Sequence, residues 1–310
     1  MIDIVVPWVN PADKNWQELN KKYSGNKGDN SKQRTRDIHI FKYFFRGIEE
    51  NCPWVRKIHL LLQAPSQIPD WLDTSNPKLH IVYHDQYIPK EFLPTFNTFV
   101  IEAFFHKIPD LEENFITCND DFIFTNPTLE KDFFQNNLPV DYPKLTKYLT
   151  CNPVHDKLYH GGKFNMFQNV LKSSQNIEKQ ITGKCPIYFN FHIPFGLKKS
   201  FIEYLWNKYE NLFLPALKDS RFRREHNFVS WLYRFIRLDF GQYIKSEKVI
   251  TDFSYRELGV SKMNDIMNDI LLKKVVILND MLCDCNEEIV SYQIKKILEA
   301  TFPNKSSFEK

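Results

Sequence analysis

The chain has 310 residues, of which 43% are hydrophobic and 25% charged, so its apolar content is ample for a folded core. The formal net charge is only +3, which gives no indication of nucleic-acid binding. Six cysteines occur without a CxxC pair or regular spacing, and this argues against both a zinc site and a disulfide framework. We therefore expect a globular protein of a reducing compartment.

The N-terminus leads directly into a strand pattern, without a basic region and a small-residue cleavage site. No uninterrupted apolar segment reaches the length of about 18 residues that a membrane-spanning helix needs. The sequence thus predicts a cytoplasmic protein, and contact with the inner face of the membrane remains open.

Strand and helix patterns alternate in the first half of the chain. The segment 18–36 is polar and contains glycines, which predicts a surface loop. Alternating strands and helices predict an α/β domain with a mainly parallel sheet. Right-handed crossovers would align the strand ends at Asn10, His84 and Asn119 along one edge of this sheet. The expected strands are 2–9, 54–62, 79–83 and 114–124, and the expected helices are 37–51 and 96–106.

Two adjacent carboxylates, Asp120 and Asp121, interrupt the apolar and aromatic pattern at 114–124. A strand that delivers Asn119 and this pair presents oxygen ligands where sheets of this kind bind their ligands. Mg²⁺ prefers oxygen ligands and is commonly held by one or two carboxylates plus substrate phosphates. The pattern indicates a site for Mg²⁺ or Mn²⁺ beside a nucleotide diphosphate, although adjacent acids also occur in turns where Asp bonds its own backbone.

The second half of the chain is less regular. Residues 125–190 predict an inserted irregular and helical region. We expect a late strand at 273–278 to return to the sheet of the first half, so that 1–310 forms a single catalytic domain. Further helices are predicted at 198–209, 221–235 and 287–302.

Two residues of the second half are candidates for chemistry. His192 follows an apolar run and precedes Pro194, and an imidazole titrates in the range useful to a general acid or base. Arg223 lies near the start of a predicted helix, where a cation is unfavourable to the helix dipole, and a guanidinium grips phosphate oxygens in a fork. The alternatives are a structural histidine and an exposed basic cluster.

Four blocks of residues resemble the Stealth proteins, the sugar-1-phosphate transferases of bacterial capsule synthesis, to which the catalytic subunit of N-acetylglucosamine-1-phosphotransferase also belongs. Together they span nearly the whole chain, and the second block is long and specific. The blocks are 2–10 with Asp13; 34–37, 53–58, 68–72, 93–97, 101–109 and 119–121; 192–194, 199–200, 222–223 and 230–233; and 278–280 with 302–310.

The resemblance implies transfer of a sugar 1-phosphate from a nucleotide diphosphate sugar, a UDP-sugar above all, to a hydroxyl of an oligosaccharide or polysaccharide acceptor. A phosphodiester would form and a nucleoside monophosphate would leave. It also implies a Rossmann-like α/β fold similar to that of nucleotide-sugar glycosyltransferases of the GT-A type. Peripheral contact with membrane-bound glycan machinery is compatible with this activity.

The resemblance also assigns roles to residues. Asp120 and Asp121 would bind the divalent ion, His192 would activate the acceptor, and Arg223 would clamp the transferred phosphate. Asp13 joins them as a catalytic residue. The residues expected to contact substrate are Asn10, Arg36, Asn97, Glu102, Asn119 and Asp280.

The sequence departs from the family pattern at two places. Pro11-Ala12 stands where many members carry Gly and a small polar residue, and Asn227 stands where an acidic residue is usual. Asn227 supports one alternative, a non-catalytic subunit that binds nucleotide sugar. The other alternative is a metal-dependent glycosyltransferase that releases the nucleoside diphosphate.

Overall fold

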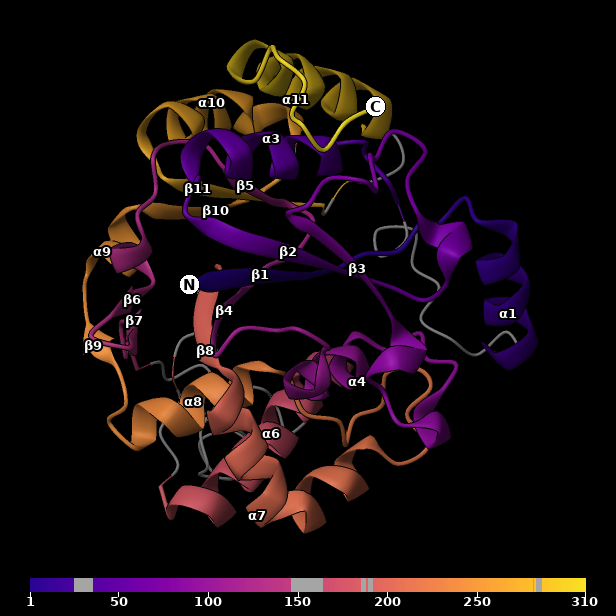
Figure 1. Cartoon of the computed structure of the whole chain (residues 1–310), viewed down its shortest axis with the longest axis vertical. Coiled ribbons are helices and arrows are strands. Elements are labelled where there is room, and N and C mark those ends of the chain that lie inside the picture. The colour runs from indigo at the N-terminus through magenta and orange to yellow at the C-terminus, as the bar shows by residue number, and fades with distance from the viewer. Residues whose placement is uncertain (25–35, 146–163, 185–187, 189–191, 281, 283–285) are drawn as a thin grey trace.

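A computed structural model describes residues 1–24, 36–145, 164–184, 188, 192–280, 282 and 286–310 (Figure 1). Its centre is a five-stranded sheet with the strand order β3-β2-β1-β4-β8. Neighbouring strands from β3 to β4 run parallel, and β8 pairs antiparallel with β4. This order and direction confirm the predicted α/β, Rossmann-like architecture. The strands are β1 (Ile2–Pro7), β2 (Val55–Leu62), β3 (Leu79–Tyr83), β4 (Asn114–Thr117) and β8 (Phe195–Lys198).

Side chains of the central sheet alternate between two apolar layers, as the two-residue period of a strand requires. Ile4 packs toward helix α3 (Phe41–Asn51), whereas Val5 packs toward the layer that contains α4 (Thr98–Ala103) and α7 (Lys199–Leu217). Both residues are fully buried. Covered on both faces, the sheet opens to solvent and ligand only along its strand ends.

A second sheet lies beside α3 (Figure 1). It has the order β10-β11-β5, with β10 and β11 parallel and β5 antiparallel to β11. Gly47 of α3 permits this packing, because a Cβ at that position would lie 2.5 Å from the carbonyl oxygen of Phe124. The elements are β5 (Phe122–Phe124), β10 (Phe253–Glu257) and β11 (Val275–Asn279), covered by α10 (Met263–Leu272) and α11 (Glu287–Thr301).

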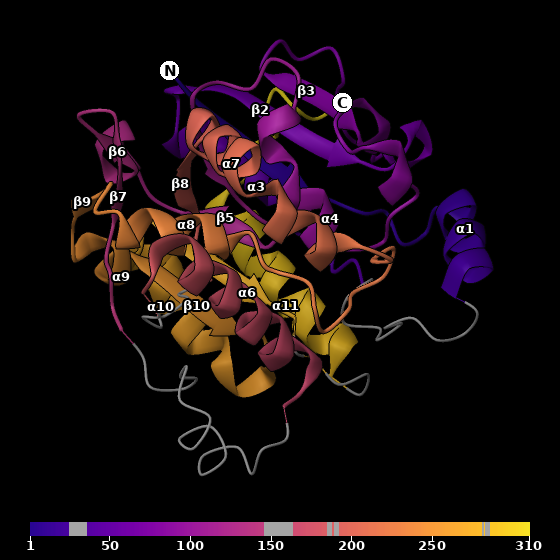
Figure 2. The ribbon, with the colours of Figure 1, turned by 90° about the horizontal axis from the view of Figure 1, so that it is seen from below.

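The remaining elements lie around these two sheets (Figure 2). Helix α1 (Lys14–Ser24) follows β1, and α6 (Met166–Thr182) packs with α8 (Trp231–Asp239). Asp141 is buried between Arg234 and Arg237, at N–O distances of 2.6 Å and 2.5 Å, and so ties the small sheet to α8. That small sheet is formed by β6 (Phe134–Gln135), β7 (Leu138–Asp141) and β9 (Ile244–Lys245), with α9 (Lys248–Thr251) beside it.

The last residues of the chain are docked onto α3. Arg46 binds the carboxylate of Glu309 with both arms of its guanidinium, at 2.7 Å and 2.6 Å, and donates to the carbonyl of Phe302 at 2.8 Å. Phe308 is 2% exposed and packs against Phe45 with a ring-centroid distance of 5.2 Å. The C-terminal residues are therefore part of the apolar layer under the central sheet.

Several predicted elements are confirmed and others are corrected. The strands expected at 2–9, 54–62 and 79–83 and the helix at 287–302 occur within one or two residues of their predicted ends. The segment expected to be a single strand at 114–124 is instead two strands in two sheets, β4 and β5. The late strand β11 was expected in the central sheet and pairs with β5 in the second sheet instead.

Three local predictions differ from the structure. The polar segment 18–36 was predicted as a loop, yet α1 continues to Ser24, and 25–35 lies outside the described residues. The helix expected at 221–235 begins only at Trp231. The helix expected from Asp37 begins at Phe41, and Asp37 instead accepts a hydrogen bond from the backbone N–H of His39 at 2.7 Å.

The predicted insertion at 125–190 contains β6, β7 and α6 among its described residues, and the single-domain assignment stays a prediction. None of the helices in the described ranges combines the length and the hydropathy that crossing a bilayer requires.

Candidate active site

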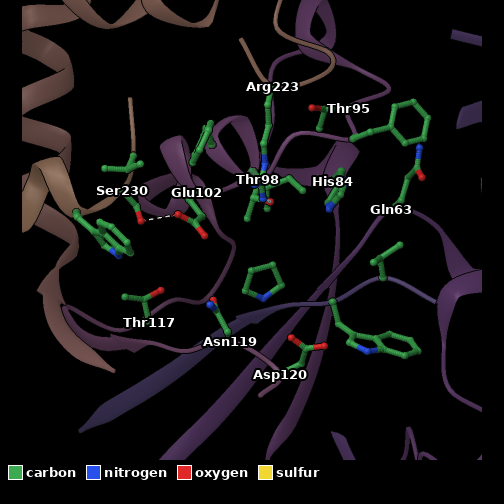
Figure 3. A pocket seen from close by; sticks show the side chains of 18 of the residues that line it. Gln63, His84, Thr95, Thr98, Glu102, Thr117, Asn119, Asp120, Arg223 and Ser230 are labelled. Carbon is green, nitrogen blue, oxygen red and sulfur yellow. Dashed lines mark hydrogen bonds between the residues drawn. The ribbon is translucent and has the colours of Figure 1, made fainter. Parts of the chain in front are cut away.

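A cavity of about 450 Å³ opens at the carboxyl ends of the parallel strands. Its floor is formed by the residues that follow β1 and β4, and its other walls come from α4, from the segment before α8 and from the start of β8. Five of the predicted site residues line it, namely Glu102, Asn119, Asp120, His192 and Arg223. Figure 3 shows Asn119 and Asp120 on one side of the cavity and Arg223 reaching in from the other.

Asn119 and Asp120 lie in the link between the two sheets. The backbone N–H of Cys118 still donates to the carbonyl of Val5 in the central sheet, at 2.9 Å. The N–H of Phe122 then turns back to the carbonyl of Asn119 at 3.2 Å, and β5 enters the second sheet. The chain therefore changes sheets at the Asn-Asp-Asp sequence, which holds Asp120 at the cavity.

Asp121 does not line the cavity, in contrast to Asp120. Its backbone carbonyl accepts from the N–H of Leu278 at 3.0 Å, and its Oδ1 atom is buried without a hydrogen-bond partner among the described residues. Burial, and then the neighbouring Asp120, raise the pKa of the Asp121 carboxyl. Burial and the charge of Asp37 raise the pKa of Asp120 as well. Both shifts disfavour the ionised carboxylates, and a cation bound beside the pair would favour them again.

This donor set fits a hard divalent cation. Such a cation offers the positive charge that two buried, adjacent carboxylates lack, and it prefers oxygen ligands. The described residues contain no cluster of three or more His, Cys, Asp or Glu side chains with metal-ligand geometry. A Mg²⁺ ion needs no such cluster, because substrate phosphates and water complete its shell.

His192 lies at the cavity in a cage of aromatic rings. Its imidazole makes edge contacts with Phe122, Trp231 and Tyr255, at centroid distances of 5.6 Å, 6.1 Å and 5.5 Å. Burial lowers its pKa to about 4, so the ring is neutral at pH 7 and can accept a proton. Its φ of 46° is in the left-handed region, which is uncommon for a residue other than glycine and is found preferentially at functional sites.

Arg223 lines the opposite wall. One of its terminal nitrogens donates to the hydroxyl of Thr98 at 2.9 Å, and its guanidinium lies 5.0 Å from the ring centroid of Phe99. No carboxylate of the described residues forms an ion pair with it. A half-buried guanidinium with N–H groups left to donate is suited to bind an anion such as phosphate.

Asn97 and Asn227 do not line the cavity, but they hold the segment that carries Arg223. Both are fully buried, and the amide of Asn97 donates to Oδ1 of Asn227 at 2.9 Å. Asn227 also accepts from the N–H of Arg224 at 2.8 Å and donates to the carbonyl of Ala216 at 2.8 Å. Because a carboxylate has no N–H to donate, Asn227 makes contacts here that the acidic residue usual in the family could not make.

Glu102 points into the cavity from α4 and accepts a short hydrogen bond from the hydroxyl of Ser230 (Figure 3). Burial raises the pKa of its carboxyl to about 7. The protonation of Glu102 can therefore change near neutral pH, whereas His192 stays neutral there.

Asn10 and Asp13 lie next to the cavity without lining it. Asn10 Oδ1 accepts from the N–H of Ala12 at 3.0 Å, so it forms the ordinary turn that Asn favours. Asp13 accepts from Ser66 at 2.7 Å and from the amide of Gln67 at 2.6 Å, and these contacts, against the effect of burial, lower its pKa. Both residues fix the loop after β1 to the 3₁₀ turn at Pro65–Gln67.

Arg36 and Asp280 come together, also outside the cavity lining. The Nε atom of Arg36 lies 3.4 Å from Oδ2 of Asp280, and a terminal nitrogen lies 3.4 Å from Glu287. Asp280 follows β11, whose Leu278 pairs with Asp121. The ion pair is therefore close in the fold to the carboxylate pair, at the edge of the second sheet.

The sequence analysis missed Thr98, Ser230 and Gln63, all of which line the cavity, and it noted His84 only as a strand end. The available signal for Gln63 and His84 was their position, since each is the first polar residue after an apolar strand. Thr98 and Ser230 gave no such signal, because their roles depend on contacts with Arg223 and Glu102.

The fold and this cavity define a class of protein. A ligand site at the carboxyl edge of a parallel sheet, with adjacent carboxylates, a neutral histidine and an arginine that has no carboxylate partner among the described residues, is typical of enzymes that act on phosphorylated substrates. Comparison with known proteins identifies the family. The family model "Stealth protein CR2, conserved region 2" matches residues 34–141. The chain belongs to the Stealth family, as full-length relatives establish.

Three of these relatives are bacterial phosphotransferases. The capsular polysaccharide phosphotransferase WcwK of Streptococcus pneumoniae is 32% identical over 343 residues, which cover 100% of this chain and 98% of the relative. The receptor polysaccharide phosphotransferase WefC of Streptococcus gordonii is 32% identical over 99% of this chain and 98% of its own length. The exopolysaccharide phosphotransferase cps2G of Lactiplantibacillus plantarum is 30% identical over 100% of this chain and 96% of its own length.

Among solved structures, that of the galactosyltransferase LgtC in complex with donor and acceptor sugar analogues aligns over 98% of both chains, with a TM-score of 0.38 and 10% sequence identity. The full-length relatives and the family model, and not this structure, confirm the family resemblance expected from the sequence blocks.

Proposed function

We propose that the chain transfers a sugar 1-phosphate from a nucleotide diphosphate sugar to a hydroxyl of a glycan acceptor, in the synthesis of a capsule or related surface polysaccharide. The observation that carries the proposal is the meeting of Asp120, Arg223 and His192 at one cavity. The names of the full-length relatives, all polysaccharide phosphotransferases, support the same reaction class.

The residues divide the reaction as follows. Arg223 holds the oxygens of the sugar-side phosphate and stabilises their charge as it grows. His192, neutral at pH 7, takes the proton of the acceptor hydroxyl. A bond forms between the acceptor oxygen and the sugar-side phosphorus, and the bond from that phosphorus to the bridging oxygen breaks. The nucleoside monophosphate leaves with the electron pair, and the proton on His192 passes to solvent.

Asn119, Asp120 and the adjacent Asp121 are the residues that would hold Mg²⁺ or Mn²⁺. When bound, such an ion neutralises the charge of the diphosphate and of the departing nucleotide. Asn119 and Asp120 line the cavity and provide an amide and a carboxylate oxygen, while Asp121 is adjacent to them in the chain and lies outside the lining. The proposal includes a UDP-sugar as donor, and action in the cytoplasm at the inner face of the membrane.

The test identifies which bond of the donor breaks from the nucleotide that is released, and it does not require the acceptor to be known. A panel of nucleotide sugars is incubated with the protein and Mg²⁺, with and without oligosaccharides, and the products are separated by mass spectrometry. We expect a nucleoside monophosphate together with a sugar 1-phosphate or its diester. Release of the nucleoside diphosphate would instead demonstrate glycosyl transfer, and binding without any turnover would favour a non-catalytic subunit.

Two controls accompany this test. Asp120→Asn keeps the shape of the side chain and removes its charge, and we expect it to abolish turnover while the melting temperature is kept or raised. EDTA should stop the wild-type reaction and added Mg²⁺ or Mn²⁺ should restore it. Full turnover in EDTA would remove the metal from the proposal.

A further inference from the structure

Two polar side chains at the far end of the cavity have no role in the chemistry described above. Gln63 follows β2 and His84 follows β3, and both line the cavity (Figure 3). Both polar atoms of the Gln63 amide and both ring nitrogens of His84 are buried, and none of them has a hydrogen-bond partner among the described residues. His84 is 5% exposed.

Buried polar atoms without partners are costly, and folded proteins rarely keep them without a reason. Gln67 provides a comparison within the same wall of the cavity. Its amide accepts from the N–H of Asn10 at 2.6 Å and donates to Asp13 at 2.6 Å. The hydrogen-bonding groups of Gln67 are therefore used within the folded protein. The amide of Gln63, only four residues away in the chain, has no such contact and is available to a ligand.

The strand order gives the position of this end relative to the reacting groups. Neighbouring strands lie about 4.8 Å apart, so β2 and β3 are offset from β4, which leads to Asp120, by about 10 Å and about 14 Å. The cavity runs along these strand ends. With the diphosphate placed at Asp120, Gln63 and His84 lie two and three strand spacings from it, on the side of the sheet away from β8.

We propose that Gln63 and His84 bind the nucleobase of the donor and read its hydrogen-bonding edge. This inference rests on the proposed function, because it takes a nucleotide sugar as the occupant of the cavity. An amide has an N–H donor and a carbonyl acceptor side by side, which match the adjacent acceptor and donor on the edge of a base. A neutral imidazole adds one donor and one acceptor, and burial, which lowers the pKa of His84 to about 3, keeps it neutral.

Equilibrium binding tests this assignment without turnover. Calorimetry compares UMP, CMP, AMP and GMP with ribose 5-phosphate, which lacks a base. We expect at least one nucleotide to bind tenfold or more tightly than ribose 5-phosphate. Gln63→Leu and His84→Leu should each weaken that nucleotide about tenfold and leave ribose 5-phosphate unchanged. Loss of binding for both ligands alike, or for neither, would overturn the proposal.

Stability provides a second readout that a structural role could not reproduce. Because Gln63 and His84 leave polar atoms unpaired in the empty protein, Gln63→Leu and His84→Leu should keep or raise the melting temperature. Gln67→Leu, which breaks bonds to Asn10 and Asp13, should lower it, and exposed Gln180→Ala should leave both stability and binding unchanged. If the Gln63 and His84 variants instead lower the melting temperature as much as Gln67→Leu does, the two residues stabilise the folded protein, directly or through an ordered water, and do not serve a ligand.

The two proposals can fail separately. Base-dependent binding that requires Gln63 and His84, without transfer of a sugar phosphate, would keep this inference and refute the proposed reaction. Transfer with unchanged nucleotide affinity in both variants would do the opposite.

Discussion

Replacing Arg223 is the most direct way to test whether the cavity acts on a phosphate. In the structure its guanidinium makes one hydrogen bond, to Thr98, and has no carboxylate partner among the described residues. Two charge-assisted hydrogen bonds to phosphate oxygens, each worth about 1.5–3 kcal/mol, give a total of about 3–6 kcal/mol. Since a tenfold change in rate corresponds to about 1.4 kcal/mol, Arg223→Ala should lower kcat/KM by about 10²–10⁴-fold.

A second substitution at Arg223 tests whether the planar shape of the guanidinium matters as well as its charge. Arg223→Lys keeps the charge but loses the planar fork, so we expect an activity between those of wild type and Arg223→Ala. Initial rates of nucleoside monophosphate release, measured at several donor concentrations, separate kcat from KM. If the contact is made mainly in the transition state, kcat falls and KM changes little.

The neighbouring residue provides the matched control. Arg224 is exposed and its only side-chain hydrogen bond among the described residues is a long one of 3.5 Å to the carbonyl of Asp219. Arg224→Ala should stay within about twofold of wild type, as surface substitutions usually do. A loss below about tenfold for Arg223→Ala, or equal losses for both arginines, would refute the phosphate role and leave an exposed basic cluster.

Three further predictions follow from other parts of the molecule. His192→Ala should reduce turnover at pH 7 by about 10²-fold or more. Because the imidazole is neutral above its pKa of about 4, protonation of His192 should not lower the wild-type kcat/KM near pH 6.5, and His192→Ala should not change the shape of the pH profile there. The raised pKa of Glu102, about 7 in place of 4.5, means that ionisation at higher pH costs stability. The stability that the neutral Glu102 carboxyl provides is fully present below about pH 4.5 and is lost as the pH rises through about 7. This loss lowers the free energy of unfolding by up to about 3 kcal/mol. Urea unfolding at pH 5 and pH 8 should show this slope in wild type and a smaller one in Glu102→Gln, and equal slopes would contradict the assignment. Glu309→Gln leaves Arg46, whose side chain is 9% exposed, without its anionic partner, and should cost about 3 kcal/mol in urea unfolding, whereas exposed Glu210→Gln should cost less than about 0.5 kcal/mol.

The central sheet could be predicted from the sequence because its signals are local. The runs that form β1, β2 and β3 are apolar, are bounded by turn residues, and alternate with helix-period segments. Their parallel order follows from general rules for βαβ connections, which predict that the ends of β1, β3 and β4 lie at one edge. Glu102, Asn119, Asp120, His192 and Arg223 then share the cavity, as the family resemblance had implied.

The polar residues Asn119–Asp121 mark an interruption in 114–124, but nothing local shows that the two halves belong to different sheets. Phe115 and Ile116 are as apolar as Ile123 and Phe124, so both halves fit one buried sheet equally well. The partner of β5 is β11, more than a hundred residues later, and a pairing of that kind depends on tertiary contacts.

The supporting residues of the site were hidden for the same reason. Asn97 seemed suited to contact a ligand, but its amide is consumed by Ser220 and Asn227, whose positions no local pattern reveals. The helix predicted from Arg221 was also overridden, because the backbone carbonyl of Arg221 accepts from Phe96 and its guanidinium binds the carbonyl of Pro94. The tertiary contacts of this segment, and not its propensity, determine where Arg223 is held.

The passage of the chain from the central sheet to the second sheet at Asn119–Asp121 makes the site sensitive to events far from it. The backbone on one side of these residues is tied to Val5, and on the other side to Leu278. A small shift of one sheet against the other would re-aim the Asp120 oxygens while every helix stayed folded. Affinity for the proposed divalent ion should then report how well the two sheets are assembled, and it should decline in weakened variants before any spectroscopic sign of unfolding appears.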